Sequence, residues 1–372
     1  MMAGIALGPS LLGRVSPDAY AYLLPPSIVP LLNGVAQAGI AIYMFLVGLE
    51  LNVDRVRWRA RATIAISNAG IVAPFLLGAA LAIYLYPRLS TSAVPFTGFA
   101  LFIGTAMSIT AFPVLARILS DRRLTETDLG VVALTCAAVD DASAWCLLAI
   151  VVGVTQASVG TAWLVAVLAI AYTAFMLVAG RPAAIRLAAA GGRPGAGVVA
   201  IALAAMALSA SITQWIGVHA IFGAFLAGAI VPHDSPLATA IVRRMKAPVT
   251  ILLVPAFFAL SGMRTRVDLL SGASDWLICG AIVLAASAGK VLGCLAAARA
   301  SGMSPRDSAA LAVLMNTRGL MELIVLNIGL DLGVIEPRLF TMMVIMALAT
   351  TMATSPILDR VLEGAGIAEA AG

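Results

Sequence analysis

Long apolar runs, each about the length of a membrane-spanning helix, dominate this chain of 372 residues. An α-helix needs about 20 consecutive apolar residues to cross the hydrocarbon core of a bilayer. Twelve runs follow one another between short polar stretches, at residues 1–14, 32–50, 63–86, 96–119, 127–153, 160–180, 196–214, 217–232, 247–262, 274–299, 307–331 and 337–358. The pattern predicts an all-α polytopic membrane protein with about twelve transmembrane helices.

The overall composition agrees with a membrane protein. Hydrophobic residues make up 62% of the chain and charged residues 11%, whereas soluble domains are about 45–50% apolar and about 25% charged. No polar stretch is long enough to form a soluble domain. We therefore expect one transmembrane domain over residues 1–358 and a short cytoplasmic tail at 359–372.

The first apolar run is too short to cross a bilayer. At about 1.5 Å per residue, residues 1–14 cover roughly two-thirds of the hydrocarbon core. A signal peptide is not expected, because the run has neither a basic start nor a convincing cleavage site. We expect a truncated helix whose beginning lies outside this chain.

The basic residues are distributed unequally between alternate loops. Loops on the cytoplasmic side of a membrane protein are enriched in Lys and Arg. Five basic residues lie in one set of loops: Arg14, Arg88, Arg264, Arg266 and Arg338. Fifteen lie in the other set: Arg55, Arg57, Arg59, Arg61, Arg122, Arg123, Arg181, Arg186, Arg193, Arg243, Arg244, Lys246, Arg299, Arg306 and Arg360. This split predicts that residue 1 and the C-terminus are cytoplasmic. Because these residues are spread over six loops, the net charge of +5 gives no reason to expect nucleic-acid binding.

The cysteines and histidines do not have the spacing of metal ligands. We expect no tightly bound transition metal and no cofactor. The cysteines lie in apolar runs, where packing is their expected role, and the histidines are isolated from one another: Cys136, Cys146, Cys279, Cys294, His219 and His233.

Two of the predicted helices contain helix breakers beside polar residues near mid-membrane. They are the fourth and the eleventh runs, at 96–119 and 307–331, and because their positions in the series differ by seven, an odd number, they would cross the membrane in opposite directions. Interrupted helices in inverted repeats indicate a substrate site in secondary transporters. An ordinary kink is the alternative. The residues concerned are Ser108, Thr110 and Pro113 in one run, and Asn316, Thr317 and Gly319 in the other.

A few ionisable residues lie at membrane depth, where each costs about 2.5–3.5 kcal/mol on insertion scales. They are Asp140, Asp141, Lys290, Arg318 and Glu322. Charges so expensive to bury mark the expected site of function.

The adjacent carboxylates of Asp140 and Asp141 suit an exchange of ions. Desolvation and mutual repulsion disfavour a doubly ionised pair, so at least one carboxylate takes up a proton readily. Once deprotonated, its oxygens are hard ligands for Na⁺ or K⁺. Protons and cations would then compete for one site. The alternative is a purely structural pair, neutralised by Lys290 and Arg318.

The remaining buried charges are expected to pair. Lys290 requires a carboxylate partner, and either aspartate is a candidate. Displacement of that pair by an arriving cation would couple the two ions, or the pair could be permanent and structural. Arg318 and Glu322 lie one helical turn apart and can pair with each other, or they could neutralise the ends of the half-helices.

Four stretches of the sequence resemble the monovalent cation:proton antiporter-2 family, in particular its Kef-like and plant CHX-like branch. They span nearly the whole chain in the expected order. These are GIALGPSLLG at 4–13, MSITAFPVLARIL at 107–119 with AAVDDASAW at 137–145, GAFLAGAIVP at 223–232, and GKVLGC at 289–294 with MNTRGLMELIVLNIGL at 315–330.

The resemblance implies an inverted-repeat fold with two crossed discontinuous helices. It implies a core of helices at about 63–153 and 274–358, a dimerisation scaffold at about 1–50 and 160–262, and alternating access by movement of the core. Asp141 matches the essential ion-binding carboxylate and Asp140 the position before it, while Lys290 matches the basic partner. Thr110 and Pro113 match the first helix crossing, and the second crossing is matched by Asn316, Thr317, Arg318 and Gly319. Relatives usually begin with one further complete helix.

We therefore expect a secondary antiporter, not an enzyme, that exchanges a monovalent cation for protons and acts as a homodimer in a plasma or inner membrane. The paired aspartates favour Na⁺, whereas the flanking motifs favour K⁺. Asp141 and Asp140 are the expected binding residues, with Ser108 and Glu322 as secondary ones. The rival functions are an uncoupled, channel-like cation pathway, an organic-anion symporter and a non-transporting ion sensor.

Overall fold

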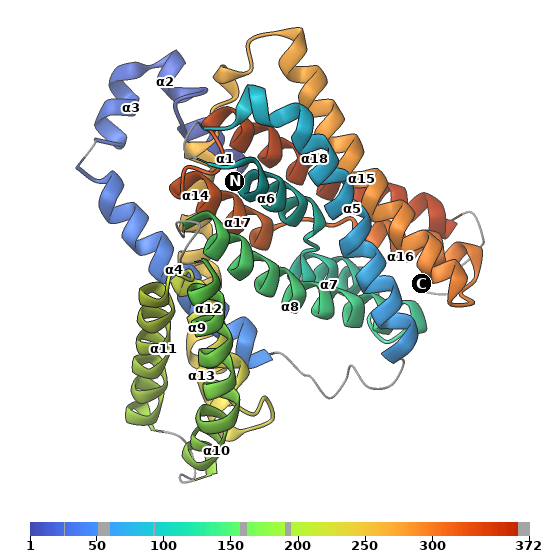
Figure 1. The fold of residues 1–372 in the computed structure, drawn as a ribbon. Coiled ribbons are helices and arrows are strands. Elements are labelled where there is room, and N and C mark those ends of the chain that lie inside the picture. The colour runs from blue at the N-terminus through green and yellow to red at the C-terminus, as the bar shows by residue number, and fades with distance from the viewer. Residues whose placement is uncertain (26, 51–59, 92–93, 157–161, 190–194, 364–372) are drawn as a thin grey trace. The chain divides into compact units, whose positions relative to one another are not determined.

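The structure is a computed structural model, and within the residues that it describes the chain forms helices and no strand (Figure 1). The described residues are 1–372 without 26, 51–59, 92–93, 157–161, 190–194 and 364–372. Four of the basic loop residues, Arg55, Arg57, Arg59 and Arg193, and most of the expected tail lie outside them.

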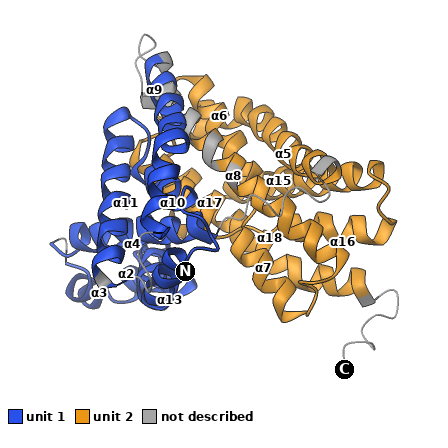
Figure 2. Cartoon of the chain, turned by 90° about the horizontal axis from the view of Figure 1, so that it is seen from below, with its two compact units in different colours: residues 1–52, 152–266 blue, residues 53–151, 267–372 orange. Residues whose placement is uncertain are grey.

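The chain folds into two compact units, coloured separately in Figure 2. Unit 1 consists of residues 1–52 and 152–266, and unit 2 of residues 53–151 and 267–372. Each unit therefore combines two separate stretches of the sequence.

Unit 2 contains the helices that carry the candidate site. Its elements are α5 (Ala60–Leu89), α6 (Phe96–Ser108), α7 (Phe112–Asp121), most of α8 (Asp128–Gln156), the short 3₁₀ helix η4 (Val267–Leu269), α15 (Ala273–Ala300), α16 (Pro305–Met315), α17 (Leu320–Asp331) and α18 (Pro337–Glu363).

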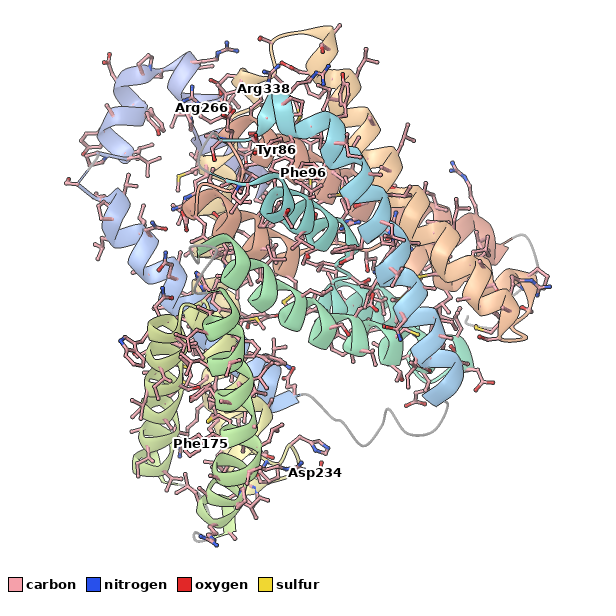
Figure 3. The ribbon with its side chains drawn as sticks, viewed as in Figure 1. Tyr86, Phe96, Phe175, Asp234, Arg266 and Arg338 are labelled. Carbon is pink, nitrogen blue, oxygen red and sulfur yellow. The ribbon has the colours of Figure 1, made fainter. Side chains whose placement is uncertain are left out.

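Helices α5 and α15 pack closely along their length (Figure 1). The missing side chain of Gly289 on α15 permits this approach, because a Cβ there would lie 2.6 Å from the Cα of Pro74 on α5. Small residues at such contacts let membrane helices pack through van der Waals forces. At the end of α5, Tyr86 meets Phe96 of α6 edge to face, with ring centroids 5.4 Å apart (Figure 3).

Both predicted interrupted helices are present in unit 2. The first is broken between α6 and α7, where the backbone of Ile109 and Ala111 is extended. The second is broken between α16 and α17 at residues 316–319, and its two halves are bent by 40°. Pro113 is the second residue of α7, a position where the missing N–H of proline costs no helical hydrogen bond.

Unit 1 contains the remaining helices. Its elements are α1 (Met2–Leu7), α2 (Leu12–Val15), α3 (Pro17–Leu23), α4 (Val29–Glu50), α9 (Ala162–Phe175), the π-helix η2 (Met176–Gly180), α10 (Arg181–Ala189), α11 (Ala196–Ile216), α12 (Ala220–Ala229), α13 (Pro236–Pro248), the π-helix η3 (Val249–Leu253) and α14 (Val254–Arg264).

Helices α4 and α12 form the tightest contact of unit 1. A Cβ on Gly48 of α4 would collide with the carbonyl oxygen of Phe225 on α12, and one on Gly228 of α12 would collide with the carbonyl oxygen of Phe45 on α4. The two glycines therefore let the helix backbones touch on both sides of the contact.

The described residues include eight helices long and apolar enough to cross a membrane, or nine with the bent pair of α16 and α17. The chain is thus a multi-pass integral membrane protein. The first predicted run is divided into α1 and α2, and α12 has only ten residues. The predicted total of twelve spans stays a prediction.

One predicted loop is helical. The segment with Arg243, Arg244 and Lys246 belongs to α13, which continues through η3 into α14. Ser235 caps α13 by accepting from the N–H of Ala238. The helix is amphipathic, so an apolar run does not reveal it.

Candidate functional site

All the candidate site residues lie in unit 2, around the point where the two broken helices meet. The N–H of Ala111 donates to the carbonyl of Thr317 at 2.9 Å. The Thr110 hydroxyl donates to the carbonyl of Met315 at 3.1 Å. Each break therefore supplies partners for backbone groups that the other break leaves without a helical hydrogen bond.

Asp140, on α8, is a buried carboxylate whose two oxygens are both occupied. Its Oδ1 accepts from the hydroxyl of Ser67 on α5. Its Oδ2 accepts from Thr110 Oγ1 at 2.8 Å and from Lys290 Nζ at 2.7 Å. Three different helices or breaks thus hold this carboxylate in one orientation.

Asp141, the next residue of α8, is also buried but is much less occupied. It is 5% exposed, and its Oδ1 has no hydrogen-bond partner. The backbone N–H of Phe112, the first residue of α7, hydrogen-bonds its carboxylate.

Lys290, on α15, is completely buried. Besides Asp140, its ammonium donates to the carbonyl of Ser108 at 2.6 Å, at the end of α6. The sequence left both aspartates open as its partner, and the structure has Asp140 in that position. Removing one partner of such a buried pair leaves a charge without compensation.

Arg318 and Glu322 form a second buried ion pair, with 2.8 Å between Nη1 and Oε2. Arg318 also donates to the carbonyls of Ala106 and Met107 at 3.0 and 2.6 Å. These carbonyls belong to the last turn of α6, the negative end of a half-helix. The guanidinium therefore occupies the place between the end of α6 and the start of α17.

Two functional partners were not found from the sequence. Ser67 contacts Asp140, and Thr351 of α18 bonds the backbone of Arg318 twice, accepting from its N–H at 2.9 Å and donating to its carbonyl at 2.7 Å. Gly319 then begins α17, and Asn316 donates to Ser287 at 3.4 Å. Ser67 and Thr351 are ordinary polar residues in apolar runs, and no local pattern distinguishes them.

The arrangement provides hard oxygen ligands in a buried place. One carboxylate oxygen of Asp141 is available, while Asp140, Lys290 and the broken helices form a fixed frame on one side of it. Carboxylate oxygens are able to bind both protons and alkali cations, since both are hard.

Comparison with known proteins identifies the family. The sequence profile described as "Sodium/hydrogen exchanger, transmembrane" matches residues 1–363. The chain belongs to this exchanger family. The match covers both units and every candidate site residue.

Several proteins named as antiporters are similar over most of this chain. The Na(+)/H(+) antiporter NhaS4 of Synechocystis is 45% identical, over 97% of this chain and 89% of its own length. Cation/H(+) antiporter 20 of Arabidopsis thaliana is 38% identical, over 96% and 44%. K(+)/H(+) antiporter 1 of Saccharomyces cerevisiae is 32% identical, over 96% and 42%. The chain therefore spans less than half of these plant and yeast relatives.

The fold matches that of a solved exchanger. The sodium proton antiporter MjNhaP1 from Methanocaldococcus jannaschii superposes with a TM-score of 0.64 over 96% of this chain and 88% of its own, at 14% sequence identity. Together with the two broken helices, this likeness confirms the predicted class of fold.

Proposed function

We propose that this protein is a secondary antiporter that exchanges a monovalent cation for protons at Asp141, with Asp140 as its fixed neighbour. The observation that carries the proposal is the unequal occupancy of the pair. Asp140 is held by Ser67, Thr110 and Lys290, whereas Asp141 has a free oxygen in a buried place. Asp141 is therefore the carboxylate able to change partners.

The exchange requires no covalent chemistry. A proton on Asp141 leaves toward one side of the membrane, and the carboxylate then binds a cation, whose release allows the next proton to bind. Since one carboxylate cannot hold both, the two ions are coupled by competition. Lys290 stays bonded to Asp140, whose two oxygens are both occupied.

Alternating access is the proposed form of the movement. Helices at about 63–153 and 274–358 form the moving core in this proposal, and those at about 1–50 and 160–262 form the scaffold of a homodimer. The protein resides in a plasma or inner membrane with its C-terminus in the cytoplasm. The unequal split of basic residues between the two sets of predicted loops supports this orientation, because cytoplasmic loops are enriched in Lys and Arg.

The relatives support K⁺ and Na⁺ as the candidate cations. The cyanobacterial relative is named for Na⁺ and the yeast relative for K⁺. The motifs beside the site favour K⁺, and the doubly acidic site favours Na⁺. Which of the two cations the protein transports is therefore a question for measurement.

The test is reconstitution into vesicles that contain a pH-sensitive dye. Addition of K⁺, Na⁺ or Li⁺ outside is expected to make the interior more alkaline, because each entering cation drives protons out. The response should be absent in Asp141→Asn. Cation flux without a pH change would show an uncoupled channel-like pathway. Cation binding without any flux would show a sensor.

A further inference from the structure

Ser67 completes the set of hydrogen bonds around Asp140. Its hydroxyl, on α5, is completely buried and donates to Oδ1 of that carboxylate. The other oxygen, Oδ2, accepts from Thr110 and from Lys290. Both oxygens of Asp140 thus have a donor, whereas Oδ1 of Asp141 has none. A cation could bind to Asp140 only by replacing groups that already bond it.

Lys290 is held at a second point besides Asp140. Its ammonium also donates to the carbonyl of Ser108, the last residue of α6, at 2.6 Å. Neither side chain of the Lys290–Asp140 pair has exposed surface. Gly70 of α5 lies beside the ammonium, since a Cβ there would be 3.8 Å from Nζ. Protein interiors are packed as densely as organic crystals, so Lys290 can leave Asp140 only if its surroundings repack.

The groups that hold this ion pair all belong to unit 2, the orange unit of Figure 2. They come from α5, α8, α15 and the break that follows α6. The proposed moving core corresponds to unit 2, so its movement against a scaffold does not require any of these bonds to stretch. Removing the partner of a buried charge is strongly unfavourable. Both facts favour a pair that stays intact.

We propose that Ser67 and Thr110 are positioning residues that keep this ion pair closed throughout the transport cycle, so that one proton is exchanged for one cation and no net charge crosses the membrane. The inference rests on the proposed function and adds its stoichiometry. The O–H bond of protonated Asp141 breaks, the proton leaves, and the carboxylate binds one monovalent cation. The closed pair has a total charge of zero, even if its shared proton moves from Nζ to Oδ2. It therefore adds no proton to the exchange.

A cation that displaced Lys290 from Asp140 would give a different stoichiometry. The freed ammonium could then lose a proton, and two protons, one from Lys290 and one from Asp141, would be exchanged for one cation. Such an exchange moves net charge across the membrane, and the membrane potential acts on it. The two stoichiometries therefore differ in the ion gradients at which exchange stops.

The test measures this balance point. The protein is reconstituted into vesicles that contain a pH-sensitive dye, with K⁺ or Na⁺ at different concentrations on the two sides. The external pH is varied until the dye reports no net proton movement. A thiocyanate gradient, present or absent, sets the membrane potential through a permeant anion. The balance point does not depend on how much protein is active, so partial unfolding does not imitate a change in stoichiometry.

We expect exchange by the wild type to stop when the proton and cation concentration ratios across the membrane are equal, with or without the thiocyanate gradient. Ser67→Ala frees Oδ1 of Asp140 for the cation. Its balance point should shift toward half the pH difference of the wild type and should move with the membrane potential. The matched control is Ser308→Ala, a completely buried serine of α16 whose hydroxyl has no hydrogen-bond partner, and it should keep the balance point of the wild type.

Two results would overturn the inference. One is a wild-type balance point that lies at half that pH difference or moves with the membrane potential, since the pair would then open during the cycle. The other is a Ser67→Ala balance point equal to that of Ser308→Ala, since the Ser67 hydroxyl would then not keep the pair closed. Either result leaves the proposed function intact, because a balance point exists only when the two fluxes are coupled. A wild type without any cation-driven proton movement would overturn the proposed function itself.

Discussion

Two neighbouring aspartates on α8 have opposite surroundings, and this difference separates their roles. Asp140 accepts three hydrogen bonds from side chains, whereas Asp141 Oδ1 accepts none. Burying a charge is tolerated when the charge is paired and hydrogen-bonded. In the proposed function, Asp140 is therefore part of the frame and Asp141 is the exchangeable ligand.

The Lys290–Asp140 pair can be tested by removing its charges one at a time. Lys290→Met leaves Asp140 buried without its counter-ion, and we expect a loss of ~3–5 kcal/mol in stability. Lys290→Met combined with Asp140→Asn should be more stable than Lys290→Met alone, because no buried charge is then unpaired. Thermal unfolding in detergent measures which of the two variants is more stable. Equal stability of the single and double variants would show that the two groups do not form an energetic pair.

The sequence was sufficient to predict the charged residues of the candidate site, because an ionisable side chain in an apolar run is conspicuous. It could not choose between Asp140 and Asp141 as the partner of Lys290. Adjacent residues point about 100° apart on a helix. Which of the two aspartates faces Lys290 therefore depends on how α8 is rotated against α15, and the sequence does not give that rotation. Ser67 was missed for the same reason.

At the scale of helices, the two breaks depend on side chains that replace lost backbone bonds. Thr351 bonds both the N–H and the carbonyl of Arg318. We expect Thr351→Val to destabilise the protein by ~1–3 kcal/mol, the cost of buried polar groups left unsatisfied, and to slow exchange. Thr354→Val is the matched control, since Thr354 bonds only within α18. Thr351→Val should have a lower thermal unfolding midpoint and a slower exchange rate in the vesicle assay than Thr354→Val. The reverse order would show that Thr351 does not stabilise the break between α16 and α17.

The contact between α5 and α15 provides a second test. Gly289→Ala forces a methyl group against Pro74 and should destabilise unit 2 by ~1–3 kcal/mol. Gly280→Ala on the same helix meets nothing within 4 Å, and should be neutral or stabilising by up to about 1 kcal/mol through helix propensity. The two midpoints of thermal unfolding are compared directly. If the Gly289→Ala protein were as stable as the Gly280→Ala protein, α5 and α15 would lie further apart at Gly289 than the structure has them.

Helices with uniform apolar surfaces were predictable, whereas other helices were not. The runs that became α4, α5, α15 and α18 are long and apolar, so their length alone identifies them. The amphipathic α13 was expected as a loop because its charged face interrupts the apolar run. Residues 1–14 are divided into α1 and α2 by a bend at Gly8 and Pro9. The mean hydropathy of the run does not reveal this bend.

At the scale of the whole molecule, the proposed function rests on one competition. A cation and a proton cannot occupy Asp141 together, so cation binding must release protons and must weaken as pH falls. The frame around Asp140 does not change in this exchange. In this proposal, coupling resides in the single carboxylate of Asp141, with the broken helices and Lys290 holding its surroundings in place.

The most direct test of this account is the count of protons released when a cation binds. The purified protein in weakly buffered detergent solution is titrated with K⁺ and with Na⁺ while pH is recorded. We predict proton release that saturates with cation binding in the wild type and is absent in Asp141→Asn. Cation binding without proton release, or release that persists undiminished in Asp141→Asn, would contradict the account.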